Sequence, residues 1–141
     1  MGSMFKFNGF TPKANTAVNC AIDEAAALGH TYIGSEHLLL GLLTEGSGAA
    51  FITLQLGGVQ PAKVRDLLVK TVGRGVRSSL TPADITPRCK RILEGALMQA
   101  RLSGLPYAGT EHILATLLKE GESYGVRFLR QLSVEPETLL R

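Results

Sequence analysis

The chain has 141 residues and a net charge of +3, with 15 Lys and Arg against 12 Asp and Glu. Apolar residues make up 45% and charged residues 19%, which supports one domain with a buried core and excludes a disordered chain. The basic residues are too few and scattered to indicate nucleic-acid binding, and no apolar run approaches the roughly 18 residues of a membrane span. Residues 1–9 lack the pattern of a secretory leader, and we interpret them as a tag remnant, Met1–Ser3, and an N-terminal segment.

An internal repeat organises the rest of the sequence. Residues 10–46 and 85–121 align without a gap at an offset of 75 positions, and 14 of the 37 aligned positions are identical. Unrelated segments share far fewer, so the two stretches represent two copies of one structural unit. We predict one domain in which residues 10–72 form the first repeat, residues 73–84 a linker loop rich in Gly, Ser and Pro, and residues 85–141 the second repeat.

The sequence of each repeat predicts four short helices. The first helix begins after a Thr-Pro step, at Thr11 and again at Thr86, where threonine caps the helix and proline takes its first position. Apolar residues then follow helical spacing until Gly29 and Gly104 end these helices. The second helices are predicted to start at Ser35 and Thr110. The third helices are predicted to cover about 48–56 and 123–132, and the fourth to start at Pro61 and Pro136.

No segment shows the alternation typical of a strand. The predicted fold class is therefore all-α, with eight short helices as two pseudo-twofold four-helix repeats in one compact domain. Short helices are unstable alone, so the leucine faces of the two halves should be buried together. The offset of 75 leaves the last helix of the second copy truncated, and we expect the chain to be a fragment of a longer protein.

These motifs resemble a known family. The first repeat reads F-T-P-x-A and then L-G-H-x-Y-I-G-S-E-H-L-L-L-G-L-L-x-E-G, and the G-[ST]-E-H-[LI]-L tract occurs over both Gly34–Leu39 and Gly109–Leu114. With Gly73-Arg74-Gly75 after the first repeat, they resemble the N-terminal domain of Clp ATPases, in particular the ClpC branch. The resemblance covers nearly all of residues 10–141.

The resemblance implies a binding module and not an enzyme. It implies docking of adaptor proteins and tagged substrates for a hexameric ATP-driven unfoldase that feeds a protease, and binding of phosphoarginine. The family's guanidinium-binding glutamates match Glu36 and Glu111, and its threonines near the phosphate match Thr11 and Thr86. We expect no cofactor in this domain, because it has no Gly-Lys dipeptide and hence no P-loop, and ATP would bind the remainder of the parent protein. We expect a cytoplasmic location, a monomeric isolated domain, and no nucleic-acid or membrane partner.

The chemistry suits these residues. Phosphoarginine joins a planar donor fork to an anion; a carboxylate fits the fork, and a helix N-terminus fits the anion. Acidic residues and threonines also favour helix starts for stability alone, so the residues by themselves leave both roles open. Leu105-Pro106 stands where the first repeat has His30-Thr31, which puts the equivalence of the two sites in question.

Other signals predict structure rather than chemistry. Gly121–Gly125 matches the G-x-S-x-G of hydrolases, but no strand precedes it and no histidine follows, so Ser123 should only cap a helix. No metal site is predicted: the three histidines lack ligand spacing and are expected to pack near helix starts, and the two cysteines, Cys20 and Cys89, should be free thiols on buried helix faces. A basic cluster around the linker is expected to be a solvated face, with attraction of acidic adaptors or phosphate groups as the alternative; it comprises Arg74, Arg77, Arg88, Lys90 and Arg91.

Two alternatives remain open for the whole chain: a free-standing regulator with the same fold, and a helical nucleic-acid-binding protein. The second would need a strongly basic recognition helix, which none of the predicted helices provides. Tyr32 and Tyr107 precede the two Glu-His pairs at the same distance, either as core residues or as the lining of a peptide groove.

Overall fold

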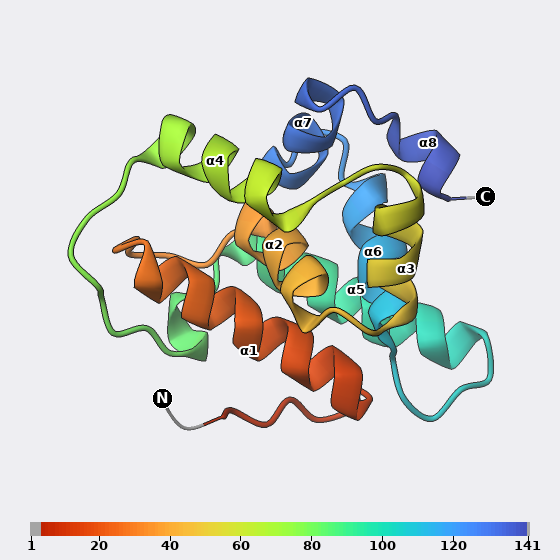
Figure 1. Cartoon of the computed structure of the whole chain (residues 1–141). Coiled ribbons are helices and arrows are strands. Elements are labelled where there is room, and N and C mark those ends of the chain that lie inside the picture. Colours follow the sequence, from red (N-terminus) through yellow and green to blue (C-terminus); the bar gives the residue numbers. More distant parts are fainter. Residues whose placement is uncertain (1–3, 141) are drawn as a thin grey trace.

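The computed structural model of the chain describes residues 4–140; the predicted tag remnant Met1–Ser3 lies outside these residues. Eight α-helices are present, and residues 4–140 contain no β-strand, only two isolated bridges. The first repeat forms α1 (Pro12–Ala27), α2 (Ser35–Glu45), α3 (Ala49–Leu56) and α4 (Pro61–Val72). The second forms α5 (Pro87–Leu102), α6 (Thr110–Lys119), α7 (Tyr124–Gln131) and α8 (Pro136–Leu139). The predicted all-α class and the two sets of four helices are confirmed (Figure 1).

The helix ends follow the local chemistry. The Thr11 hydroxyl accepts a hydrogen bond from the Ala14 N–H at 3.2 Å, and Thr86 accepts one from the Cys89 N–H at 3.1 Å. Proline follows each threonine at the first helical position, where an N–H would have no intrahelical partner. Gly29, with φ of +77°, turns the chain after α1 in a left-handed conformation that favours glycine.

The two repeats interleave instead of lying side by side. The third helix of each repeat packs against the second helix of the other, so that α3 contacts α6 and α7 contacts α2. Short parallel bridges pair Phe10 with Ala108 and Ile33 with Ile85. Since each bridge joins the segment before a first helix to the loop before the other repeat's second helix, the start of α1 lies beside the start of α6, and the start of α5 beside that of α2.

The core is centred on α2, which lies in the middle of the molecule in Figure 1. Among residues 4–140, α2 packs against α1, α3, α4, α5, α6 and α7. All residues from Ser35 to Leu43 are buried, and five of them are leucines. A helix that is apolar on all sides is stable only when it is enclosed, so the interleaved repeats supply the cover that α2 requires. The leucine faces are buried together, as predicted.

The linker contains more order than the predicted loop. It includes one turn of 3-10 helix over Pro82–Asp84, closed by reciprocal hydrogen bonds between Thr81 and Asp84. Before that turn it is tied to the end of α1: the Gly75 N–H donates to the Leu28 carbonyl at 2.9 Å, and the Ser78 hydroxyl donates to the His30 carbonyl at 2.6 Å. The linker is therefore part of the packed domain.

Both cysteines are free, as predicted. Cys89 is buried, but Cys20 is only half-buried, so the expectation that both lie on buried faces is correct for Cys89 alone. Within residues 4–140, no single helix is long and apolar enough to cross a membrane; α2 and α3 pass that test only as a pair, and they meet at an angle of 97°.

Candidate functional site: two pockets between the repeats

Two pockets lie where the repeats meet. The Glu111 pocket has a cavity volume of about 630 Å³ and is lined by Thr11, Pro12, Lys13, Gly48, Ala49, Leu105, Pro106, Tyr107, Gly109, Thr110, Glu111 and His112. The Glu36 pocket has a volume of about 410 Å³ and is lined by Tyr32, Gly34, Ser35, Glu36, Thr86, Pro87, Arg88, Arg91 and Tyr124. Eight of the nine positions lining the Glu36 pocket have their counterpart, 75 residues away, in the Glu111 pocket. The chain therefore builds the same site twice.

Each pocket is composed of both repeats. Thr11 of the first repeat faces the same cavity as Glu111 of the second, while Thr86 of the second shares a cavity with Glu36 of the first. The four residues singled out from the sequence thus fall into two pairs, and each pair crosses between repeats. Aligning the two copies does not predict that each pocket combines residues of both repeats. The two isolated bridges bring these residues together.

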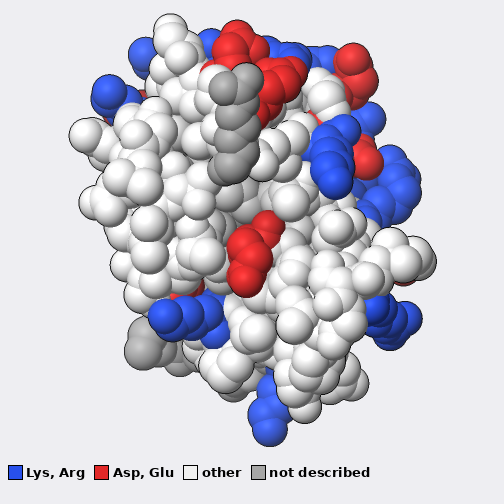
Figure 2. Space-filling view, turned by 90° about the vertical axis from the view of Figure 1, so that its right-hand side faces the viewer, with Lys and Arg blue, Asp and Glu red and all other residues white. Residues whose placement is uncertain are grey.

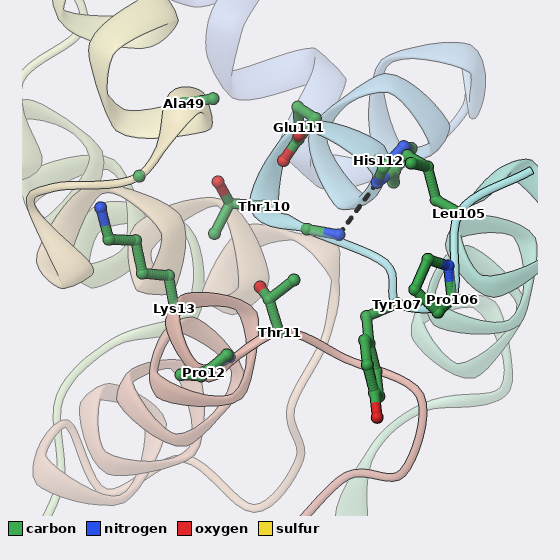
Figure 3. Close-up of a pocket in the computed structure, with 12 residues that line it drawn as sticks. Thr11, Pro12, Lys13, Ala49, Leu105, Pro106, Tyr107, Thr110, Glu111 and His112 are labelled. Carbon is green, nitrogen blue, oxygen red and sulfur yellow. Dashed lines mark hydrogen bonds between the residues drawn. The ribbon is translucent and has the colours of Figure 1, made fainter. Parts of the chain in front are cut away.

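Three helices begin at each pocket. The first turns of α1, α3 and α6 line the Glu111 pocket, and those of α2, α5 and α7 line the Glu36 pocket. The positive ends of three helix dipoles therefore meet at each pocket, which favours a bound anion. In Figure 3, Thr11, Thr110 and Lys13 lie around the same opening as Glu111.

A glycine and a histidine fix each glutamate at its helix start. A β-carbon on Gly34 or Gly109 would overlap the carboxylate of Glu36 or Glu111, so glycine leaves room for the acid to fold back over the helix end. The backbone N–H of each glycine donates to the Nδ1 atom of the histidine three residues on, at 3.0 Å for His37. The histidines therefore cap α2 and α6, in keeping with the predicted packing at helix starts.

The two glutamates differ in exposure. Glu36 is 3% exposed, and its carboxylate accepts a hydrogen bond from the Tyr32 hydroxyl at 2.9 Å. Burial raises the pKa of the Glu36 carboxyl, an effect that bonds from its own backbone N–H and from Tyr32 oppose. Glu111 is exposed, and its counterpart tyrosine, Tyr107, is 57% exposed; within residues 4–140, neither side chain has a hydrogen-bond partner.

Sequence reasoning assigned no role to Lys13, and it placed Arg88 and Arg91 in the basic cluster around the linker. Lys13 lines the Glu111 pocket and Arg88 holds the equivalent place in the other, directly after each Thr-Pro step. The repetition of a basic residue at this position in both copies was a signal that alignment could have provided. Arg91, assigned to a solvated basic face, also lines the Glu36 pocket, whereas Arg74 and Arg77 are exposed in the linker, as predicted. Both tyrosines line pockets, which favours the groove interpretation over core packing.

The Glu111 pocket opens on a weakly charged face. Figure 2 shows the side of the molecule to which α3 and α6 belong: a small acidic patch is surrounded by uncharged side chains, with Lys and Arg toward the margins. Ile52 and Leu56 of α3 are exposed apolar residues, as is Leu105 in the loop before α6. A carboxylate in such surroundings is available to a cationic group on a partner.

Two buried histidines, His37 and His30, form a chain of three hydrogen bonds behind Glu36. The Gly34 N–H can only donate, so Nδ1 of neutral His37 accepts and its Nε2–H donates to Nδ1 of His30 at 2.7 Å. Nε2–H of His30 then donates to the Gly73 carbonyl at 2.8 Å. Burial, followed by the neighbouring His30, lowers the pKa of His37 to about 3. These hydrogen bonds join the start of α2 to the linker. In the second repeat, Leu105 stands at the position equivalent to His30.

The remaining motif has a structural role. Ser123 is buried and caps α7 by accepting a hydrogen bond from the Val126 N–H at 3.3 Å, as predicted from its position. Residues 4–140 hold no group of three His, Cys, Asp or Glu side chains that would coordinate a metal.

Comparison with known proteins identifies the family. The family model "Clp repeat (R) N-terminal domain" matches residues 9–139. The chain belongs to the Clp N-terminal repeat family. It is 42% identical over 128 residues to the negative regulator of genetic competence ClpC/MecB of Bacillus subtilis (strain 168), covering 91% of this chain and 16% of the relative. It is 40% identical over 133 residues to the chloroplastic chaperone protein ClpC1 of Arabidopsis thaliana, covering 94% of this chain and 14% of the relative.

The solved structures agree with the sequence comparison. The N-terminal domain of the ClpD chaperone from Arabidopsis thaliana matches with a TM-score of 0.79 at 25% identity, covering 96% of this Clp N-domain and 94% of that chain. The N-terminal domain of the ClpV1 ATPase from E. coli matches with a TM-score of 0.67 at 21% identity, over 93% and 81% of the two chains, which shows a shared fold. The resemblance read from the repeated G-[ST]-E-H tract is confirmed. This Clp N-domain spans about one seventh of the length of its curated relatives.

Proposed function

We propose that this Clp N-domain is the substrate- and adaptor-recognition module of a ClpC-type ATP-dependent unfoldase, and that its Glu111 pocket binds phosphoarginine on marked proteins. Support comes from the family and from relatives named ClpC, one of which is described as a chaperone. The module binds reversibly and performs no chemistry of its own; ATP would act in the remainder of a hexameric, protease-associated parent. A bacterial parent would be cytoplasmic, while the chloroplastic relatives make the plastid the alternative compartment.

The observation that carries the proposal is the pairing of opposite charges in one open pocket. Lys13 and Glu111 line the same cavity, both are exposed, and neither takes part in an ion pair within residues 4–140. A ligand that carries a cation next to an anion matches both. Phosphoarginine is such a ligand, because its guanidinium offers a donor fork to a carboxylate and its phosphate offers acceptors to an ammonium.

Hydroxyl groups complete the anion side of the pocket. Thr110 is 2% exposed and its oxygen accepts the Ala50 N–H at 3.2 Å, while in residues 4–140 its own hydroxyl hydrogen is donated to no acceptor. The Thr11 hydroxyl oxygen likewise accepts the Ala14 N–H, and within residues 4–140 its hydrogen is donated to no acceptor. Two hydroxyl donors, the Lys13 ammonium and three helix starts therefore surround the place proposed for the phosphate (Figure 3).

Isothermal titration calorimetry with free phosphoarginine tests the proposal, with arginine as the ligand control. We expect saturable binding of phosphoarginine and none of arginine. Glu111→Gln keeps the shape of the side chain but removes its charge, so affinity should fall at least about tenfold, the scale of one charge-assisted hydrogen-bond pair. Glu94→Gln, a change at an exposed glutamate of α5 outside both pockets, is the matched control. Equal affinity of the folded Glu111→Gln variant would refute the assignment.

A further inference from the structure

The Glu36 pocket repeats the positions of the Glu111 pocket but not their chemistry. We infer that the Glu36 pocket binds an oxyanion that carries no guanidinium, on a phosphorylated or acidic peptide side chain, so that the two pockets of this domain take different ligands. The inference rests on the proposed function in treating both pockets as ligand sites. It departs from the equal roles that the sequence suggested for Glu36 and Glu111.

The first argument is the balance of charge. Arg88 and Arg91 both line the Glu36 pocket, where the corresponding residues of the first repeat are Lys13 and the uncharged Thr16. Arg88 is oriented by the Glu122 carbonyl, which accepts from its Nη1 atom at 2.9 Å, and by the Glu120 carboxylate, which lies 4.0 Å from its Nε atom; its Nη2 donors remain for a ligand. Two arginines attract an anion, bind it through paired hydrogen bonds, and repel a second guanidinium.

The second argument is that the Glu36 carboxylate is already occupied. It is 97% buried, and the Tyr32 hydroxyl donates to its Oε2 atom at 2.9 Å. A guanidinium fork needs both carboxylate oxygens along an open edge, which Glu111 offers and Glu36 does not. The Glu36 pocket therefore lacks the group that would recognise the arginine part of phosphoarginine.

The third argument is a buried hydroxyl that can donate one more hydrogen bond. Ser35 is 96% buried and lines the Glu36 pocket; its oxygen accepts the Gly125 N–H at 3.0 Å, and within the described chain its hydroxyl hydrogen is donated to no acceptor. A hydroxyl that already accepts one hydrogen bond can still donate its hydrogen to a ligand. An oxyanion beside the arginines would accept it.

The fourth argument is the shape of the opening. Tyr124 stands where the Glu111 pocket has Ala49, and the cavity is smaller, about 410 Å³ against about 630 Å³. The guanidinium carbon of Arg127 lies 5.3 Å from the centre of the Tyr124 ring, which holds the ring in place. The narrower, more basic pocket fits the end of a short anionic side chain better than the long phosphoarginine side chain.

The test compares ligands and matched variants on the whole domain. The ligands are O-phosphoserine, phosphoarginine and glutarate, titrated by calorimetry and followed by amide NMR shifts at Gly34 and Gly109. Arg91→Thr introduces the residue found at the equivalent position, and Lys13→Thr removes a cation from the other pocket. Both side chains are exposed, so the fold should persist, and circular dichroism checks this.

We expect O-phosphoserine to bind once per chain and to shift Gly34, with affinity at least about tenfold lower in Arg91→Thr and unchanged in Lys13→Thr. Phosphoarginine should bind once and shift Gly109. Glutarate binding with the same Arg91 dependence would support the inference and assign an acidic peptide as the source. Two equivalent phosphoarginine sites, or loss of O-phosphoserine binding in Lys13→Thr but not Arg91→Thr, would overturn it. If phosphoarginine binds neither pocket while O-phosphoserine still depends on Arg91, the proposed function fails and this inference stands.

Discussion

The buried histidine chain predicts that this Clp N-domain loses stability in mild acid. His37 has a pKa of about 3 in the folded domain, against about 6.5 for an unperturbed histidine. Between these values the unfolded chain binds a proton that the folded chain does not, so the contribution of His37 is full above pH 6.5 and falls as the pH drops toward 3. The slope approaches about 1.4 kcal/mol per pH unit, which amounts to about 2 kcal/mol between pH 7.5 and 5.

Urea denaturation followed by circular dichroism from pH 7.5 to 5 measures this loss. Glu36, whose pKa is raised in the folded state, acts in the opposite sense, because its protonation at low pH favours the folded state. The wild-type curve should therefore be compared with that of His37→Gln, in which glutamine still reaches back to the Gly34 N–H but does not titrate. The difference between the two curves should follow the predicted slope. Parallel wild-type and His37→Gln curves would refute the reasoning.

Two further predictions concern packing and thiol reactivity. A β-carbon at Gly41 would collide with the backbone of α1, so Gly41→Ala should lower the free energy of unfolding by about 1–3 kcal/mol in chemical denaturation, although alanine favours helices. In the control, Gly95→Ala, the added β-carbon would meet only a methyl group of Thr116 at 2.7 Å, so the loss should be smaller. Equal losses in the two variants would contradict this account. Half-buried Cys20 should react with a thiol reagent at pH 8 in the folded domain. Burial raises the pKa of the Cys89 thiol to about 12, so Cys89 should react only on unfolding. Equal labelling rates of the two thiols would contradict this prediction.

Much of the fold was predictable because its determinants are local. The Thr-Pro steps before α1 and α5, and the prolines that open α4 and α8, mark helix starts through capping and fixed backbone geometry that depend only on neighbouring residues. The order within the linker was not predictable, because it depends on contacts with the end of α1, such as the bond from Ser78 to His30, more than 40 residues away in the sequence.

The composition of the pockets was not predictable for the same reason. Glu36 and Glu111 are alike in sequence and in the glycine and histidine that hold them, so the alignment treats them as equal. They differ in their surroundings: Glu36 accepts a hydrogen bond from Tyr32 and shares its pocket with Tyr124 of α7, where the Glu111 pocket has Ala49. Local motifs identify such residues, but long-range packing decides which of them a ligand reaches.

Interleaving also explains how the two pockets can diverge while the fold is kept. Most lining residues are at helix starts, where side chains point into the cavity and contribute little to the core. The change from Ala49 to Tyr124, and from Thr16 to Arg91, alters the size and charge of one pocket, yet these positions are half-buried or exposed in both repeats. The buried leucines Leu39, Leu42 and Leu43 of α2 recur in α6 as Leu114, Leu117 and Leu118. A duplicated unit can thus acquire a second ligand preference through surface substitutions of small energetic cost, as long as the glycines that seat the two glutamates are retained.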